Sequence, residues 1–287
     1  MKFWTHFWML LVFVAIGFGF CMLFSVGSGV LIALHHEVVA MHLLQWSQTV
    51  FVMMLAPLCW YRFYHLKAER PSWRRCLDEA RMTNISWQPM AVTFCLMMAA
   101  LPAFDSLEVM MNRLPWPEPI HNYIINGFET NQKILVILLG ISGFWGWVES
   151  FLLMCLCTAM GEELMFRGAL LSCFRNQTRL NMHAIAWMVG FIFAFIHFEP
   201  AGFVVRWLLG VLLVYLVWWT GSLWPSILAH CMNNTFALIG YWMATPEEQM
   251  QLSTEYTFGP VLTIASVVVA CLLLRVLWQM RAEKTAE

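Results

Sequence analysis

Two adjacent glutamates and an arginine interrupt a long apolar stretch in the middle of the chain. The apolar run Ile134–Met160 leads directly into the sequence Glu162-Glu163-x-x-x-Arg167. Charged groups removed from water cost several kcal/mol unless they are paired or hydrated. In a helix, Glu163 and Arg167 are one turn apart and can pair, whereas Glu162 is rotated from Glu163 by about 100°. We therefore expect Glu163 to form an ion pair. We expect the Glu162 side chain to point toward the site of a chemical reaction.

Further polar residues lie in the later apolar segments. His197 ends an apolar run just before Glu199-Pro200, where a helix is expected to stop. His230 and Asn234 are four residues apart and therefore share one helix face. Taken singly, each histidine could be a core imidazole bonded to a backbone carbonyl. Ionisable groups within membrane spans, however, face the bundle interior or a wet cavity, so we expect this set to converge.

The chemistry open to such a set is hydrolysis. A carboxylate and an imidazole on either side of one water can deprotonate it and pass the proton on. A second histidine and an amide can donate hydrogen bonds to a developing oxyanion. These groups suffice for the attack of water on a peptide carbonyl. Glutamate and histidine are also ordinary zinc ligands, so a zinc site formed by Glu162, His197 and His230 is an open alternative.

Two other classes of intramembrane hydrolase are excluded. An aspartyl dyad needs two aspartates within the membrane, and the chain has only Asp78 and Asp105, which lie outside the predicted spans. A zincin needs the sequence HExxH. The nearest approach is His36-Glu37 followed by His42, where the spacing is wrong.

Two groups of polar residues have no catalytic assignment. Glu149, within the fourth predicted span, either faces the same cavity or pairs with Arg206. The other group lies at the outer end of the first two spans and is interpreted as an interfacial turn rather than a metal site; it comprises His35, His36, Glu37 and His42.

The amino-acid composition is typical of an integral membrane protein. Of the 287 residues, 61% are hydrophobic and 11% are charged, whereas a soluble domain has about 25% charged residues. The chain is therefore expected to be an all-α polytopic membrane protein. Its nine cysteines contain no CxxC pair and are interpreted as buried hydrophobic residues. No basic stripe with interleaved aromatics appears, which excludes nucleic acid as a partner.

About eight transmembrane helices are predicted, taking about 20 residues for each crossing. No internal repeat appears, so residues 1–287 are expected to form a single membrane domain. The predicted spans are Phe7–Ile32, Val39–Trp60, Trp87–Phe104, Ile134–Met160, His183–Phe198, Phe203–Thr220, Trp224–Met243 and Phe258–Trp278.

The distribution of basic residues predicts the orientation. Six of the sixteen Lys and Arg residues lie in the loop from Tyr61 to Ser86, which the positive-inside rule places in the cytoplasm. Alternation of the spans then places both termini in the cytoplasm and the loop Asp105–Gln132 outside. The adjacent glutamates are expected in the cytoplasmic half of the membrane.

Three short motifs in this order resemble the signature of the CPBP (Abi) family. They are the Glu-Glu-x-x-x-Arg motif, Phe193-x-x-x-His197 and His230-x-x-x-Asn234. The family comprises CAAX-processing endopeptidases and many bacterial relatives. The resemblance covers roughly residues 134–243, which would form the catalytic core, whereas residues 1–133 carry no recognised motif.

The resemblance implies a glutamic-type intramembrane endopeptidase with no cofactor, although a divalent metal stays open. Glu162 and His197 would activate water, and Glu163 would hold the motif in place. The oxyanion would be stabilised by His230 and Asn234, and Arg167 would pair with Glu163.

The expected partners are the lipid bilayer and a membrane-associated protein or peptide substrate. Recognition of a lipidated residue stays open, as does the oligomeric state. The short loops and compact length favour a bacterial inner-membrane protein. The rival hypothesis is a non-catalytic chaperone, scaffold or immunity factor of the same family. The intact set of six motif positions favours the enzyme.

Overall fold

The computed structural model describes residues 2–67, 71–140, 143–177 and 180–284 of the chain. Arg70, one of the six basic residues of the loop that sets the predicted orientation, lies outside these ranges. Within them the regular structure is entirely helical, with no strand. The prediction of an all-α membrane protein is therefore confirmed.

Six helices of the described residues are long and apolar enough to cross a membrane. Two further predicted spans are also helical: α10 (Met182–Phe195) is shorter, and α12 (Trp224–Met243) is not among the six. The number eight and the side of the termini stay predictions. The six helices are Phe3–Ala33, Glu37–His65, Trp87–Asn112, Gly143–Arg175, Phe203–Thr220 and Pro260–Arg281.

Three predicted boundaries are wrong. The fourth span does not end at Met160, because its helix continues to Arg175. The fourth span does not begin at Ile134, because this residue belongs to α6 (Glu118–Leu138), and a new helix begins at Gly143. Gly143 has φ +83°, a left-handed conformation that glycine adopts without steric cost. The third span, α5 (Trp87–Asn112), continues past Phe104. A count of apolar residues cannot locate a helix break that lies inside an apolar run. It also cannot show that a helix continues where its last turns are polar.

The chain forms two compact units that interleave along the sequence. Unit 1 contains the adjacent glutamates, and unit 2 contains His197, His230 and Asn234. Unit 1 comprises Met1–Asn84, Leu135–Ile185 and Ser222–Ile227, and unit 2 comprises Ile85–Ile134, Ala186–Gly221 and Leu228–Glu287.

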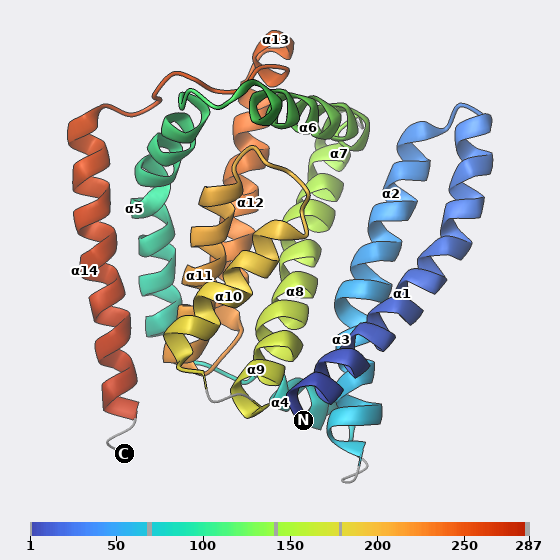
Figure 1. Cartoon of the computed structure of the whole chain (residues 1–287), viewed down its shortest axis with the longest axis vertical. Coiled ribbons are helices and arrows are strands. Elements are labelled where there is room, and N and C mark those ends of the chain that lie inside the picture. The colour runs from blue at the N-terminus through green and yellow to red at the C-terminus, as the bar shows by residue number, and fades with distance from the viewer. Residues whose placement is uncertain (1, 68–70, 141–142, 178–179, 285–287) are drawn as a thin grey trace. The chain divides into compact units, whose positions relative to one another are not determined.

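In unit 1, the helix α1 (Lys2–Ala33) packs along the helix that follows it in sequence (Figure 1). That second helix alternates α-helical and π-helical segments and is followed by the short α4 (Trp73–Glu79), which Ser72 caps. The segments of the second helix are α2 (Glu37–Ser47), η1 (Gln48–Leu55), α3 (Ala56–Trp60) and η2 (Tyr61–His65).

The other long helix of unit 1, here called the motif helix, carries the adjacent glutamates. It packs against η1 through Gly161, where an added Cβ would lie 2.9 Å from the Met53 Cβ. Small residues let membrane helices approach closely, so this glycine sets the distance between the two helices. The motif helix consists of α7 (Gly143–Ser150), η4 (Phe151–Cys157), α8 (Thr158–Glu163), η5 (Leu164–Leu170) and α9 (Leu171–Gln177).

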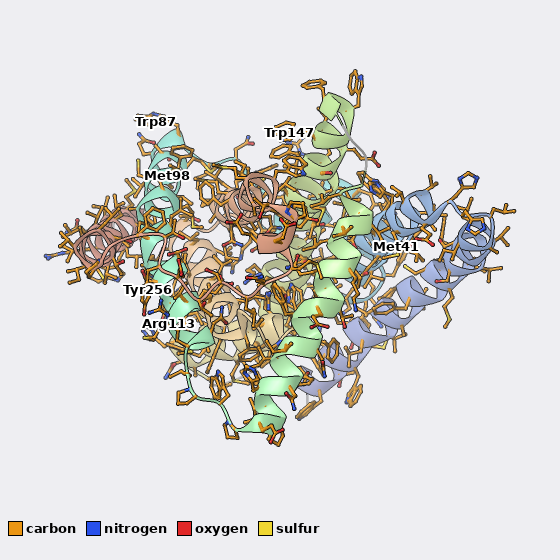
Figure 2. The ribbon with its side chains drawn as sticks, turned by 90° about the horizontal axis from the view of Figure 1, so that it is seen from above. Met41, Trp87, Met98, Arg113, Trp147 and Tyr256 are labelled. Atoms are coloured by element: carbon orange, nitrogen blue, oxygen red, sulfur yellow. The ribbon has the colours of Figure 1, made fainter. Side chains whose placement is uncertain are left out.

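In unit 2, α5 packs along α14 (Pro260–Lys284), and both contact α11 (Phe203–Thr220). The segment between α12 and α14 includes the short α13 (Pro246–Gln249). This segment is tied to the end of α5 by Arg113, whose guanidinium lies 4.4 Å from the centroid of the Tyr256 ring (Figure 2). The helix α10 approaches α11 where Gly190 meets Gly210, since an added Cβ at Gly210 would lie 2.8 Å from the Gly190 Cα.

Candidate functional site

The adjacent glutamates of the motif helix have different surroundings. Glu163 and Arg167 are fully buried, and Arg167 Nη1 donates to Glu163 Oε1 over 2.8 Å. Glu162, the residue before, is partly exposed. The predicted pairing of Glu163 with Arg167 is confirmed. The ion pair occupies the Glu163 carboxylate, whereas the side chain of Glu162 is partly exposed, with its Oε2 atom buried.

Ser226 is a further residue of this site that the sequence analysis missed. Its hydroxyl donates to Glu163 Oε2, so that both carboxylate oxygens of Glu163 accept a hydrogen bond. A buried charge is stable only when its hydrogen-bonding capacity is satisfied. The sequence places Ser226 one helical turn before His230 on α12, but only the packing of the helices shows that Ser226 bonds Glu163.

In unit 2, His197 and His230 both contact the ring of Phe193. The Phe193 ring is buried and lies edge-on to both imidazoles, with its centroid 4.9 Å from that of His197 and 5.6 Å from that of His230. His197 Nδ1 lies 2.7 Å from the Phe193 carbonyl oxygen. Because a carbonyl can only accept, Nδ1 carries a hydrogen. The neutral imidazole therefore has its lone pair on Nε2, where it can accept a proton.

The chain turns sharply directly after His197. Phe198 has φ +51° and is 75% exposed. A bulky residue rarely adopts this conformation, and strained backbone is frequent at functional sites. His197 thus lies at a turn between α10 and α11, not within a regular helix.

His230 and Asn234 lie on α12, as predicted. His230 is buried, and Asn234 is partly exposed. The Asn233 amide donates to Asn234 Oδ1 over 3.4 Å. The Asn234 side chain is therefore in contact with the neighbouring amide on the same helix.

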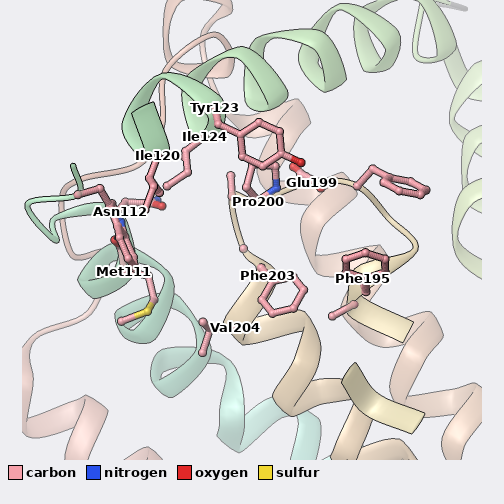
Figure 3. A pocket seen from close by; sticks show the side chains of 15 residues that line it. Met111, Asn112, Ile120, Tyr123, Ile124, Phe195, Glu199, Pro200, Phe203 and Val204 are labelled. Carbon is pink, nitrogen blue, oxygen red and sulfur yellow. The ribbon is translucent and has the colours of Figure 1, made fainter. Parts of the chain in front are cut away.

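An apolar cavity of about 570 Å³ lies beside the turn that carries His197 (Figure 3). Its walls come from the end of α5, the start of α6, and the residues between α10 and α11. At its edge Arg206 donates to Glu199 over 2.5 Å. A cavity of this size and lining suits an apolar ligand. Residues that line it include Met111, Ile120, Tyr123, Phe195, Glu199 and Phe203.

The polar residues without an assigned role have specific partners. Glu149 lies 2.6 Å from His42, and Arg206 pairs with Glu199. The turn interpretation holds for His35, which has φ +60° between α1 and α2. It is wrong for His42, which is buried within α2.

The predicted site residues thus fall into two structured groups. Glu162, Glu163 and Arg167 are placed by the motif helix of unit 1, and the two histidines are placed by the Phe193 ring in unit 2. Convergence of these groups on one substrate stays a prediction. The functional roles assigned to the individual residues also stay predictions.

Comparison with known proteins identifies the segment that carries both groups. Residues 143–236 match the family model described as type II CAAX prenyl endopeptidase Rce1-like. This segment is similar to the Rce1-like family. The match begins at the first residue of the motif helix and ends just after Asn234, and it confirms the resemblance to the CPBP family. No curated protein and no solved structure matches the chain.

The Rce1-like family is a family of proteases that act on membrane-associated proteins. The predictions of an integral membrane protein and of a peptidase are confirmed at this level. The family match does not extend to the bacterial origin, the glutamic mechanism or the substrate. These three stay predictions.

Proposed function

We propose that the chain is an intramembrane endopeptidase that hydrolyses a peptide bond of a membrane-associated protein near the cytoplasmic face. The observation that carries this proposal is the difference between the two adjacent glutamates. Glu163 accepts from Arg167 and Ser226 in a fully buried position, whereas Glu162 is partly exposed. A carboxylate that is already bonded at both oxygens makes a poor base, so Glu162 has the catalytic role.

Glu162 and His197 activate the attacking water. The Glu162 carboxylate accepts a proton as the water oxygen bonds to the scissile carbonyl carbon. His197 is suited to assist, because its bond to the Phe193 carbonyl fixes the tautomer with a lone pair on Nε2. The proton then passes to the leaving amine, and the products are a carboxylate and an amine.

His230 and Asn234 stabilise the oxyanion that forms on the carbonyl oxygen. An imidazole N–H and an amide NH₂ are both donors, and the edge contact with Phe193 orients His230 before substrate binds. Donors oriented in advance stabilise a transition state without reorganisation. Removing one such donor costs about 10²–10³ in kcat.

The substrate is an apolar peptide segment anchored in the bilayer. Support comes from the protease family that residues 143–236 match, whose members act on membrane-associated proteins. The family description also names CAAX prenyl endopeptidases, so a prenylated C-terminal peptide is the first substrate to try. Bacterial relatives without prenylated substrates make an unmodified membrane peptide the second.

Quantitative membrane peptidomics tests the activity while the substrate is still unidentified. Cells that express wild type or Glu162→Gln are compared for new peptide termini. We expect a set of termini that occurs only with wild type, and the flanking residues identify the cleavage motif. If a well-folded Glu162→Gln gives the same termini and the same phenotype as wild type, the chain is a non-catalytic partner protein and the proposal is wrong.

A chelator experiment distinguishes the zinc alternative, in which Glu162, His197 and His230 are ligands. Cleavage that is lost with chelator and restored by zinc would assign a metal mechanism. The glutamate mechanism predicts that neither treatment changes the rate. The purified full chain in detergent micelles, with a peptide identified by peptidomics, is the material for this measurement.

A further inference from the structure

A patch of cations and aromatic rings lies at the end of the second helix of unit 1, outside the motif residues. The Arg62 guanidinium on η2 lies 4.9 Å from the centroid of the Trp73 ring on α4 and 5.7 Å from that of Phe63. The two rings meet edge to face, with centroids 6.2 Å apart. Arg62 also donates to the Pro71 carbonyl oxygen, so one guanidinium joins η2 to the start of α4. The basic–aromatic patch consists of Arg62, Phe63, Lys67, Trp73 and Arg74.

Two tryptophans at the start of α1 lie at the same end of unit 1 as the patch. Trp60 Nε1 donates to the His6 carbonyl oxygen over 3.2 Å, and the rings of His6 and Tyr64 have centroids 5.1 Å apart. The first turns of α1 therefore lie beside α3 and η2, and Figure 1 shows the start of α1 and α4 at one end of unit 1. Trp4 and Trp8 are both exposed. Exposed rings thus occur at this end on α1 as well as in the patch.

The exposed rings indicate the depth of the patch in the bilayer. Phe63 is 57% exposed and Trp73 is 48% exposed, although both lie beside the Arg62 guanidinium. In membrane proteins, aromatic rings concentrate at the boundary between membrane and water, at the level of the lipid headgroups. Cations that lie among such rings are therefore at the level of the lipid phosphates.

The charge of the patch complements an anion. Lys67 and Arg74 are exposed, and neither forms an ion pair with any residue that the structure describes. The loop Tyr61–Ser86 contains six basic and three acidic residues. One of the acidic residues, Glu79, lies 3.8 Å from His65. The cations of this loop therefore outnumber its carboxylates, and two of them are open to a ligand.

We propose that the basic–aromatic patch binds the headgroup of an anionic phospholipid. The guanidinium groups of Arg62 and Arg74 suit two phosphate oxygens at once, and Lys67 adds a compact positive charge. A basic cluster directly after a membrane helix is typical of sites for anionic lipids. A zwitterionic lipid such as phosphatidylcholine binds less well, because its choline group is itself a cation. The site does not depend on proteolysis, since none of its residues belongs to the three motifs.

Native mass spectrometry of the full chain in detergent micelles tests the site by counting the lipids that stay bound. The chain is titrated with phosphatidylglycerol or with phosphatidylcholine of the same acyl chains. We expect wild type to bind phosphatidylglycerol at lower concentration. Each cation removed from the patch should weaken this binding about fivefold. The double variant Lys67→Gln with Arg74→Gln should therefore lose about thirtyfold in affinity for phosphatidylglycerol, with phosphatidylcholine binding unchanged.

A matched control removes the same number of charges elsewhere. Lys133 and Arg275 are exposed cations of unit 2, and the double variant Lys133→Gln with Arg275→Gln should bind phosphatidylglycerol as wild type does. An equal loss in this control and in the patch variant would show that lipid binding follows net charge, and the proposal would be wrong. Equal affinity of wild type for the two lipids would also overturn it.

Two single variants keep the result interpretable. If the double patch variant does not fold, as its unfolding midpoint in micelles would show, Arg74→Gln alone is measured, and about a fivefold loss is expected. Trp73→Leu keeps an apolar side chain but removes the ring beside Arg62, so phosphatidylglycerol binding should weaken about two- to fivefold. Wild-type affinity in both single variants would refute the site.

Two other occupants of the patch are outcomes of the same measurement. If inorganic phosphate at matched ionic strength displaces phosphatidylglycerol, the patch recognises a free anion and not a lipid. If poly-glutamate binds to wild type but not to the patch variant, and phosphatidylglycerol binds to neither, the partner is an acidic protein segment. Either result would overturn the proposal.

Discussion

The motif helix and the turn that carries His197 differ in what their surroundings provide. Around Glu163 and Arg167 the chain is fully buried, and each oxygen of the carboxylate has a donor. Around His197 the backbone leaves its helix, Phe198 is strained and exposed, and a cavity opens. The first region holds charges in a fixed position, and the second leaves space for a ligand. Fixed geometry and ligand access are therefore provided by different parts of the chain.

Substitution of the two adjacent glutamates should give the strongest contrast. Glu162→Gln should lower kcat by about 10²–10⁴, the contribution of a general base, with little change in the unfolding midpoint. Glu163→Gln should lower activity and the midpoint together, because it weakens the buried pair. Kinetics and thermal unfolding of both variants provide the check. If both variants changed kcat and the unfolding midpoint equally, the assignment of Glu162 as the base and of Glu163 as a supporting residue would be wrong.

Breaking the buried pair should have the next largest effect. Arg167→Ala leaves the Glu163 carboxylate buried without its cation, at a cost of about 3–5 kcal/mol. Arg175→Ala, at an exposed arginine of the same helix, should change stability little. The check is chemical denaturation in micelles. The combined Glu163→Gln and Arg167→Met variant should be more stable than Arg167→Ala; if it is less stable, the pair is not the cause.

The contact between the motif helix and η1 predicts a smaller loss of stability. Gly161→Ala places a Cβ 2.9 Å from the Met53 Cβ, and such overpacking costs about 1–3 kcal/mol. Gly168→Ala is the matched control, because its Cβ would meet Leu164 Cδ1 at an ordinary 3.5 Å. The unfolding midpoints of the two variants should therefore differ. Similar midpoints would show that the helices can separate without cost.

The weakest effect concerns the ring that joins the two histidines. Phe193→Leu keeps an apolar side chain but removes the edge contacts with His197 and His230. Such contacts contribute about 0.5–1.5 kcal/mol each, so the loss of one of them from the transition state should lower kcat roughly two- to twelvefold. Phe191→Leu, at an exposed phenylalanine of the same helix, should leave kcat unchanged. A loss confined to KM would assign Phe193 to substrate binding instead.

Local sequence patterns predicted the features that depend on neighbours along the chain. The pairing of Glu163 with Arg167 follows from their spacing on one helix, and the membrane class follows from composition. The helix break before Gly143 was missed, because the residues on both sides of it are apolar. The continuation of α5 past Phe104 was missed, because a polar last turn resembles a loop in sequence.

Sequence alone was sufficient for the helical membrane class, the ion pair within one helix turn and the resemblance of the motif region to a family of proteases. The packed structure was needed to show that Ser226 bonds Glu163 and that His42 bonds Glu149. These partners are 63 and 107 residues apart. The physical reason is that a hydrogen bond between distant segments depends on how helices pack, whereas a bond within one helix depends only on the regular geometry of its backbone.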